Sequence, residues 1–348
     1  MHSFLKSNLS KINFELGRNP RIEKADNFRK FVPQPYKAVF HLSADFELAW
    51  AWRYSKKHQD PLQEAVQRAR RARKNMPEIL RLCDEYCVPI SWATVGHLFL
   101  ESCDCNEQQQ AHAKLTRIPH FENDYWRYDQ GDWFDDDPCS SLQEAPEWYC
   151  PDLLDKIQAS EVPHEIGCHT FSHIDCRDGI CPPQVMADEL QECRELARQR
   201  NISLKSFIFP AHTVGNLDVL AAAGFTNYRS NLGNVLGFPV KHANGLWEIK
   251  SSYHLEKRKE WSADYQIYRI RKVIDRAIQN NTVCHFWFHP SFPSSYLHEI
   301  VPSVFAYLNE KREDILLTTT GDYTDWLNGE LSTEALCEAG IGSSEKVG

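Results

Sequence analysis

The sequence contains no long apolar run and no basic stripe. Over its 348 residues, no stretch approaches the roughly 18 apolar residues of a membrane-spanning helix. Residues 1–17 carry charges at Lys6, Lys11 and Glu15 and have no apolar segment like that of a secretory signal. The formal net charge is −9, which disfavours binding to the phosphates of a nucleic acid. We therefore expect a cytoplasmic protein without a membrane span and without a nucleic-acid partner.

The chain also lacks the cysteine pattern of a disulfide-stapled or zinc-binding module. It has 12 cysteines, but without a secretory signal we expect most of them to be reduced thiols. Cys83 with Cys87, and Cys103 with Cys105, are the close cysteine pairs considered for such a module. Neither pair has a convincing second half, so we disfavour a structural zinc knuckle.

Segments with strand character alternate with helical segments about seven times along the chain. Asp60 and Pro61 are residue types preferred at the N-cap and at the first position of a helix. The expected strands are 37–46, 90–95, 164–167, 207–209, 226–229, 246–250, 282–288 and 315–319. This alternation predicts a parallel α/β sheet that is closed or nearly closed into a barrel.

Composition divides the chain into an arm, one domain and a tail. Residues 1–36 are polar and we expect an N-terminal arm; we assign 37–330 to a single barrel domain and 331–348 to a C-terminal tail. A segment at about 98–150 interrupts the domain and is rich in aspartate, proline and aromatic residues. Its aromatic density favours an ordered lid or substrate-facing loop over disorder, and a packed surface insertion is the alternative.

Two histidines stand four residues apart just after the expected strand 164–167. On a helix or helical turn, the rings of His169 and His173 would face the same way. Neutral imidazole is the commonest metal ligand in proteins, so the pair is a candidate metal site. Because the chain has 15 histidines, two ordinary surface or core histidines are the alternative on spacing alone.

A pair of acidic residues ends the first strand of the expected barrel. Asp45 and Glu47 lie two positions apart, so both face the same side of the strand end. Other reactive side chains that follow expected strands are His97, His169, His173, His212 and His289. In parallel α/β barrels the loops after the strands converge on one face, which carries the active site. We therefore expect an active site at that face.

These motifs resemble those of the polysaccharide deacetylases of the chitooligosaccharide deacetylase type. The run Ser43-Ala44-Asp45-Phe46-Glu47 stands where that family has an acidic motif, and it is similar to the acid-x-acid form of some branches. The family's His-Ser/Thr-x-x-His motif matches 169–173, and its late strand ending in histidine matches 283–289. Residues 90–96 and 318–323 are similar to two further strands. The resemblance implies a distorted, incompletely closed (β/α)7-type barrel.

The resemblance extends from about residue 37 to 328 and departs from the family at two points. Family members often carry an Arg-x-Pro motif whose arginine orients the catalytic acid, but 207–212 contains no arginine. Arg229 on the neighbouring strand and His212 are candidate replacements. The second acid is a glutamate, displaced by one residue from the usual Asp-Asp pair. The chain thus resembles an atypical member, with room for an unusual substrate or for lost activity.

The resemblance implies a mononuclear metal site of one carboxylate and two imidazoles. Glu47, His169 and His173 are the implied ligands, and Asp45 is the implied general base. Reversed roles for the two acids, and a structural role for the pair, are the alternatives. Zn²⁺ suits such a site, and so do Co²⁺, Ni²⁺, Mn²⁺ and Fe²⁺.

The resemblance also implies a general acid at His289, which would protonate the leaving nitrogen. A structural His-Pro turn is the alternative there, and the direction of His285 depends on whether the strand is regular. The candidates for substrate contact are His212, Arg229 and Trp50, the last together with Trp52 and Arg53. For these residues after the acidic motif, the alternative is hydrophobic packing over the barrel mouth.

We therefore expect a metal-dependent hydrolase that cleaves a carbon–nitrogen amide bond. N-deacetylation of an amino-sugar-containing glycan or glycan precursor is the favoured reaction. The 10 Trp, 13 Tyr and 18 Phe are more than packing usually needs, and aromatic faces suit sugar rings. The expected partner is a carbohydrate or another N-acyl small molecule. A hydrolase of non-sugar or cyclic amides and a catalytically inactive, glycan-binding barrel are the alternatives.

Overall fold

The centre of the computed structural model, which describes residues 2–231 and 233–341, is a curved sheet of ten strands. In spatial order they are β10 (Val240–Lys241), β11 (Trp247–Lys250), β8 (Asn227–Ser230), β7 (Ser206–Ile208), β6 (Glu165–Cys168), β3 (Ser91–Thr94), β2 (Ala38–Phe46), β13 (Val283–Phe288) and β12 (Tyr253–His254), with β14 (Ile315–Leu317) also paired to β2. Every pairing is parallel except that of β10 with β11. The α/β class predicted from the sequence is confirmed.

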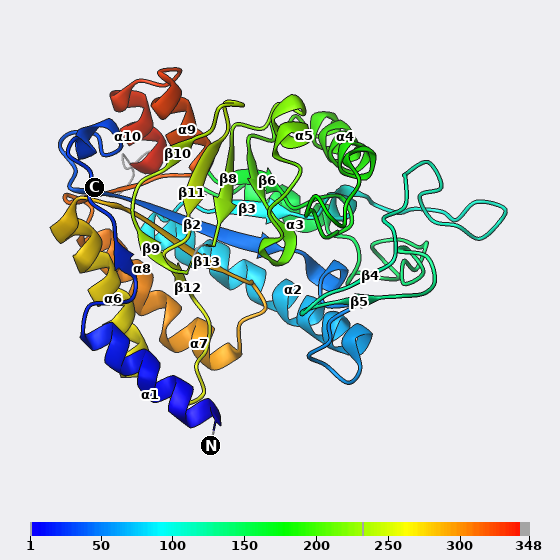
Figure 1. Ribbon diagram of the computed structural model, residues 1–348, viewed down its shortest axis with the longest axis horizontal. Helices are drawn as coiled ribbons and strands as arrows, with labels where there is room; N and C mark the ends of the chain where they lie inside the picture. Colours follow the sequence, from blue (N-terminus) through cyan, green and yellow to red (C-terminus); the bar gives the residue numbers. More distant parts are fainter. Residues whose placement is uncertain (1, 232, 342–348) are drawn as a thin grey trace.

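Strand β2 is the longest strand of the sheet and is buried along its whole length. All nine of its residues are buried, because neighbouring strands flank both of its edges and helices cover the sheet from outside (Figure 1). β13 pairs along one edge, from Val39 to Ala44. The other edge is shared, because β14 pairs with 38–40 and β3 with 43–46. This arrangement brings the acidic end of β2 to the carboxyl-terminal mouth of the barrel.

The stretch of chain from β11 to β12 contacts strands at both ends of the sheet. β11 pairs with β8, and β12, which follows after two serines, pairs with β13. The amide of Ser251 donates to the carbonyl of Ser230, and the amide of Ser252 donates to that of His285. The segment thus passes from one end of the sheet to the other without a continuous ladder between them. The barrel is therefore distorted and incompletely closed, as the resemblance implied.

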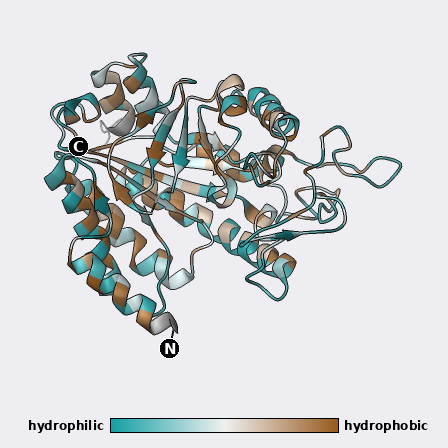
Figure 2. Cartoon of the chain, viewed as in Figure 1, coloured by the Kyte–Doolittle hydropathy of each residue, from teal (hydrophilic) through white to brown (hydrophobic). Residues whose placement is uncertain are grey.

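Amphipathic helices pack their apolar sides against the sheet, and Figure 2 shows hydrophobic residues gathered around the central strands. The helices are α1 (His2–Glu15), α2 (Pro61–Tyr86), α3 (Pro151–Gln158), α4 (Pro183–Gln199), α5 (Leu217–Ala222), α6 (Ala263–Asn280), α7 (Ser294–Glu299), α8 (Val301–Glu310), α9 (Thr320–Asn328) and α10 (Thr333–Ile341). As predicted, Asp60 caps α2 by accepting from the amide of Gln63, and Pro61 is its first residue. Within the described ranges, no helix combines the length and the apolar character that crossing a membrane requires.

Residues before β2 lie against the barrel. Helix α1 runs along α6 (Figure 1), where Lys272 forms an ion pair with Glu15 and the indole of Trp261 donates to Ser7. Strand β1 (Arg21–Ile22) pairs with β9 (Val235–Leu236). At the other end, α10 occupies part of the expected tail, and 342–348 lie outside the described residues. The division into arm, domain and tail stays a prediction.

The segment at about 98–150 protrudes from the mouth of the barrel as a set of long loops (Figure 1). Its regular structure is the two-residue hairpin of β4 (Phe121–Glu122) and β5 (Arg127–Tyr128). Short 3-10 turns lie between the strands and helices along the chain. They are η1 (Phe28–Lys30), η2 (Leu48–Trp50), η3 (Gly96–Phe99) and η4 (Pro210–His212). A disulfide between Cys105 and Cys139 and buried aromatic side chains hold the loops, while the other ten cysteines are free thiols.

Candidate active site

Glu47, His169 and His173 converge at the mouth of the barrel. Glu47 follows β2, and both histidines lie on the loop after β6. The Nε2 atoms of His169 and His173 lie 3.4 and 3.1 Å from Oε2 of Glu47. One ligand atom from each residue lies within 4.8 Å of the other two, and all three side chains are buried.

The histidine loop achieves this convergence without a helix. Residues 169–173 are irregular, with a bend at 171 and 172, and Thr170 and His173 have positive φ angles of 60° and 62°. The two rings nevertheless approach with centroids 5.0 Å apart. The expected juxtaposition of the rings is therefore present, but two left-handed residues produce it and not the helical turn that the spacing suggests.

The hydrogen bond of His169 leaves one of its nitrogens for a metal, and Nε2 of His173 contacts Oε2 of Glu47, where a metal could lie between them. Nδ1 of His169 lies 2.7 Å from the carbonyl of Ile208 and donates to it, so Nε2 is the unprotonated nitrogen. This buried Nε2 atom has no hydrogen-bond partner. Burial lowers the pKa of His173, which favours its neutral form. An acceptor pair of this kind beside a carboxylate fits a divalent metal ion.

Glu47 is ionised in this environment. Burial alone would raise its pKa, but His289, His169 and His173 outweigh burial and hold the pKa well below its ordinary value. The indole of Trp52 donates to Oε1 of Glu47 at 3.1 Å. The carboxylate is thus anchored on one oxygen and faces the two imidazoles with the other.

Asp45 is held by Arg229 from the opposite side of the barrel. Arg229 lies on β8, and its two terminal nitrogens donate to the two carboxylate oxygens of Asp45 at 2.6 and 2.8 Å. Burial would raise the pKa of Asp45, but the guanidinium charge holds it well below its ordinary value. The guanidinium also lies over the ring of Trp287, 4.7 Å from its centroid. Arg229 is therefore buried beside the acid and contacts both of its oxygens, whereas 207–212 offers no arginine to do so.

A cavity of about 320 Å³ opens above these residues. Its aromatic walls are Trp52, Tyr125, Trp126 and Trp287, and its polar lining includes both acids and His173, His212, His254 and His289. The ring of His254 stacks on Trp287, with centroids 3.7 Å apart. Burial, aided by the charge of Arg229, lowers the pKa of His212 to about 3. The imidazole of His212 is thus neutral and offers a hydrogen bond to a ligand.

The three side chains at 285, 287 and 289 face the interior of the barrel at successive depths. His285 is fully buried, and its Nε2 lies 2.8 Å from Oγ of Ser43. Trp287 lines the cavity, and His289 reaches its opening with a side chain 21% exposed. Nε2 of His289 lies 3.4 Å from Oε1 of Glu47. Side chains two positions apart on a strand face the same side, so the position of His289 indicates that Trp287 also faces the interior. Trp287 is not among the residues predicted from the sequence.

Trp50 lies away from the cavity. It is 1% exposed, donates to the carbonyl of Trp148, and packs against His97 with centroids 4.3 Å apart. Arg53 is also buried and donates to backbone carbonyls of the loops. The tryptophan that faces the cavity from this segment is Trp52. Trp126 from the segment at about 98–150 faces it from the other side, and its signal in the sequence was only the local aromatic density.

A wider groove of about 1150 Å³ lies on the outer surface between α4 and α5. Its lining includes Glu192, Arg194 and Lys205, and it contains none of the residues predicted for the active site. The candidate active site is therefore the smaller cavity at the barrel mouth.

The fold has close counterparts among solved structures. No protein-family model and no curated protein matches the sequence. The chain is similar to a Mycobacterium smegmatis protein classed as a polysaccharide deacetylase, with a TM-score of 0.59 and 12% identity over 86% of this chain and 92% of that chain. It is similar to Puue allantoinase with a TM-score of 0.59 and 10% identity, over 86% and 93% of the two chains. Agd3, described as a novel carbohydrate deacetylase, matches with a TM-score of 0.53 and 10% identity, over 85% and 54%.

The chain therefore has the fold of the polysaccharide deacetylases. Carbohydrate deacetylases and an allantoinase share this fold. At identities of 12% or less, the similarity establishes the architecture alone.

Proposed function

We propose that this protein is a metal-dependent hydrolase that cleaves carbon–nitrogen amide bonds, by N-deacetylation of an amino-sugar-containing glycan or glycan precursor. The observation that carries the proposal is the cluster of Glu47, His169 and His173 beside Asp45, at the floor of an aromatic-walled cavity. A carboxylate and two imidazoles in a concave site match a hydrolytic metal centre.

Glu47, His169 and His173 would hold the ion. The buried Nε2 of His169 makes no hydrogen bond and faces Oε2 of Glu47 at 3.4 Å, which supports this assignment, because a metal ion between the two atoms would satisfy both. When bound, a divalent ion in such a site polarises an acyl carbonyl and lowers the pKa of water. The ligand set suits Zn²⁺, and Co²⁺, Ni²⁺, Mn²⁺ and Fe²⁺ accept the same donors.

Asp45 would take the proton from the attacking water. Arg229 fixes both of its oxygens, so the carboxylate is oriented and ionised. Asp45 also lines the cavity, which gives it access to a substrate. A base that is held in one orientation avoids the entropy cost of positioning it at each turnover.

His289 would give a proton to the leaving nitrogen. Its side chain lies at the cavity opening, next to Glu47, where the acyl group would sit. An amide nitrogen leaves poorly without a proton, so a positioned acid contributes to this step.

The cavity walls support a sugar substrate. Trp52, Trp126 and Trp287 present aromatic surfaces on different sides of a volume large enough for a sugar unit. Aromatic faces pack against the apolar faces of pyranose rings, while neutral His212 and His254 offer hydrogen bonds to hydroxyl groups.

Hydrolysis by the zinc-loaded full-length protein tests the proposal, measured as acetate release from the N-acetyl compounds and as ring opening of allantoin. The substrates are N-acetylglucosamine oligomers and UDP-N-acetylglucosamine, compared with simple N-acetyl amides and with allantoin. We expect turnover of an N-acetyl sugar that Asp45→Asn abolishes and His120→Ala, at an exposed position far from the acids, leaves unchanged. Turnover of the non-sugar or cyclic amides alone would favour the second candidate function, which the missing Arg-x-Pro arginine motivates. A zinc-loaded protein inactive on all four classes would overturn the hydrolase proposal.

A further inference from the structure

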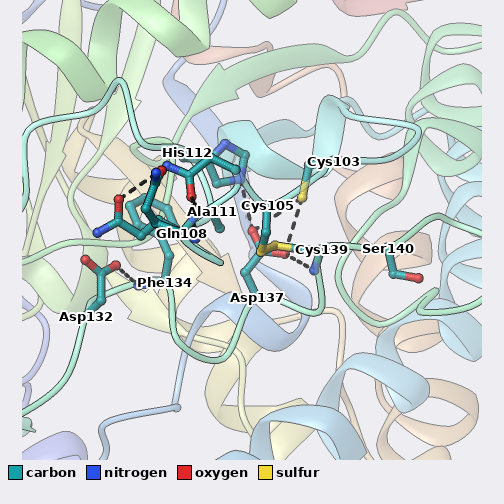
Figure 3. The surroundings of a disulfide bond; sticks show 12 residues. Cys103, Cys105, Gln108, Ala111, His112, Asp132, Phe134, Asp137, Cys139 and Ser140 are labelled. Carbon is teal, nitrogen blue, oxygen red and sulfur yellow. Dashed lines mark hydrogen bonds and ion pairs between the residues drawn. A yellow bond between two sulfur atoms is a disulfide. The ribbon is translucent and has the colours of Figure 1, made fainter.

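A second cluster of metal-binding residue types lies outside the candidate active site. His97 belongs to η3, directly after β3, and Cys103, His112 and Asp137 come from the segment at about 98–150. Figure 3 shows Cys103, His112 and Asp137 directed toward one another beside the disulfide of Cys105 and Cys139. The cluster therefore joins the barrel to the loops that protrude from it.

The four ligand atoms lie within 4.8 Å of one another, close to the spacing of a tetrahedral zinc site. Nε2 of His97 and Nε2 of His112 lie 3.1 and 2.9 Å from Oδ2 of Asp137. Sγ of Cys103 lies 3.7 Å from Nε2 of His97 and 3.6 Å from Oδ2 of Asp137. Zinc bonds of about 2.0–2.3 Å in a tetrahedron place ligand atoms about 3.2–3.8 Å apart. Small shifts of these side chains would thus admit the ion.

Hydrogen bonds around the cluster orient its side chains. Nδ1 of His97 lies 3.2 Å from the carbonyl of Trp148 and donates to it, which leaves Nε2 as the free acceptor facing Asp137. The amide of Cys139 donates to Oδ1 of Asp137 at 3.0 Å, so Oδ2 points at the imidazoles. The hydroxyl of Tyr149 lies 3.1 Å from Sγ of Cys103. Partners of this kind are typical of built metal sites.

Charge and burial favour a divalent cation at this position. The side chains of His97 and Asp137 are fully buried and that of His112 is 13% exposed. The charged partners recorded for Asp137 in the described chain are these two histidines, with no lysine or arginine. One thiolate and one carboxylate would neutralise a divalent ion, and the two imidazoles would complete its shell. A buried carboxylate is otherwise costly.

We propose that this protein binds a structural zinc ion through His97, Cys103, His112 and Asp137. Four protein ligands fill a tetrahedral shell and leave no position for water, so the ion would have a structural role. A thiolate and two imidazoles select Zn²⁺ over harder cations. The ion would fasten loops with little secondary structure to the end of β3, and thereby fix the wall that carries Trp126. The proposal does not depend on the proposed catalytic function.

Metal stoichiometry of the full chain, purified with its Cys105–Cys139 disulfide intact and loaded with zinc, is the first test. We expect two zinc ions per chain in the wild type and one in Cys103→Ser or His112→Ala. His169→Ala should also retain one, and the combination of His169→Ala with Cys103→Ser should retain none. The matched controls Cys87→Ser and His120→Ala should retain two. Equal zinc content in the wild type and in Cys103→Ser would overturn the proposal, whereas a loss confined to His169→Ala bears on the active site alone.

Cobalt spectroscopy and proteolysis test the second site with all four of its proposed ligands in place. Their results therefore do not depend on whether a variant of one of those ligands folds. Co²⁺ in the His169→Ala protein should show a thiolate charge-transfer band and the intense visible bands of tetrahedral coordination. A chelator should then speed protease cleavage within 98–150 by at least about tenfold, because local opening becomes easier without the ion. An octahedral cobalt spectrum without a thiolate band, or unchanged cleavage after chelation, would contradict the structural role.

Discussion

Arg229 binds both carboxylate oxygens of Asp45 across the interior of the barrel, at 2.6 and 2.8 Å. The two residues stand 184 positions apart in the sequence. Both are buried, with side chains 1% and 6% exposed. The pair fixes the acid and joins β8 to the end of β2, so it links the proposed chemistry to the stability of the fold.

Replacement of Arg229 by methionine should destabilise the protein. The change leaves the charge of Asp45 buried without its partner, which costs about 3–5 kcal/mol. Urea unfolding of Arg229→Met, Asp45→Asn and the double variant measures this cost. The double variant should be less destabilised than the sum of the single variants, because neither charge is then left alone. Additive effects would show that the pair is not coupled.

Glu47 and Asp45 should differ in their effect on metal content. Glu47→Gln removes an anionic donor from the cluster, so bound metal should fall by one ion per chain. Asp45→Asn should leave metal content unchanged while lowering kcat by about 10²-fold or more, because it removes the proposed base. Elemental analysis and acetate release on the same preparations check both expectations. Loss of metal in Asp45→Asn, with retention in Glu47→Gln, would reverse the two roles.

His289→Gln should affect substrates according to their leaving groups. An amide requires protonation of the leaving nitrogen, whereas an activated aryl acetate does not. We expect the variant to lower kcat on the amide by about 10²–10⁴-fold and to change ester hydrolysis much less. Equal losses on both substrates would indicate that His289 positions the acyl group and does not act as the acid.

The buried, neutral His41 should make the free energy of unfolding fall in mild acid, because only the unfolded chain then protonates this residue. Its side chain is fully buried under the barrel floor, where Nδ1 bonds to the carbonyl of Thr318, and burial lowers its pKa from 6.5 to about 4. Between these pH values the unfolded chain binds a proton that the folded chain does not bind. The free energy of unfolding should therefore fall by about 1.4 kcal/mol per pH unit from this residue as pH drops from 6.5 to 4. Above 6.5 the residue is neutral in both states and contributes no pH dependence.

Chemical denaturation at a series of pH values, with His41→Asn as the variant, checks this expectation. Asparagine keeps a donor for Thr318 but does not titrate, so its curve should be flatter by about one proton. The exposed His120→Asn is the matched control and should retain the wild-type slope. Parallel curves for the wild type and His41→Asn would show that His41 is protonated in the folded state.

The architecture could be predicted from local patterns. Apolar runs such as 37–46 and the alternation with amphipathic helices are properties of short windows, and parallel order follows from that alternation. The acids and the histidine pair could be found for the same reason, because each stands directly after a strand. The partner of Asp45 could be suggested only as one of two candidates, because the contact with Arg229 depends on how the barrel curls.

The contacts made by the segment at about 98–150 could not be predicted from the sequence. Trp50 was a candidate for the cavity, but the strand-to-turn geometry at η2 directs it under these loops, and Trp52 faces the cavity. The sequence disfavours a zinc knuckle at Cys103 and Cys105, and the structure brings Cys103 instead to His97, His112 and Asp137. Such a group has no short-range spacing to recognise, because irregular loops and buried contacts assemble it.

The shared edge of β2 affects how the chain folds while it is synthesised on the ribosome. Residues 38–40 have no strand partner on this edge until β14 is made, because its residues are synthesised some 270 positions later. Until then, a third of one edge of β2 has exposed amide and carbonyl groups, which can pair with other chains. Folding of this barrel can therefore finish only after nearly the whole chain has emerged, and fragments that end before β14 should aggregate.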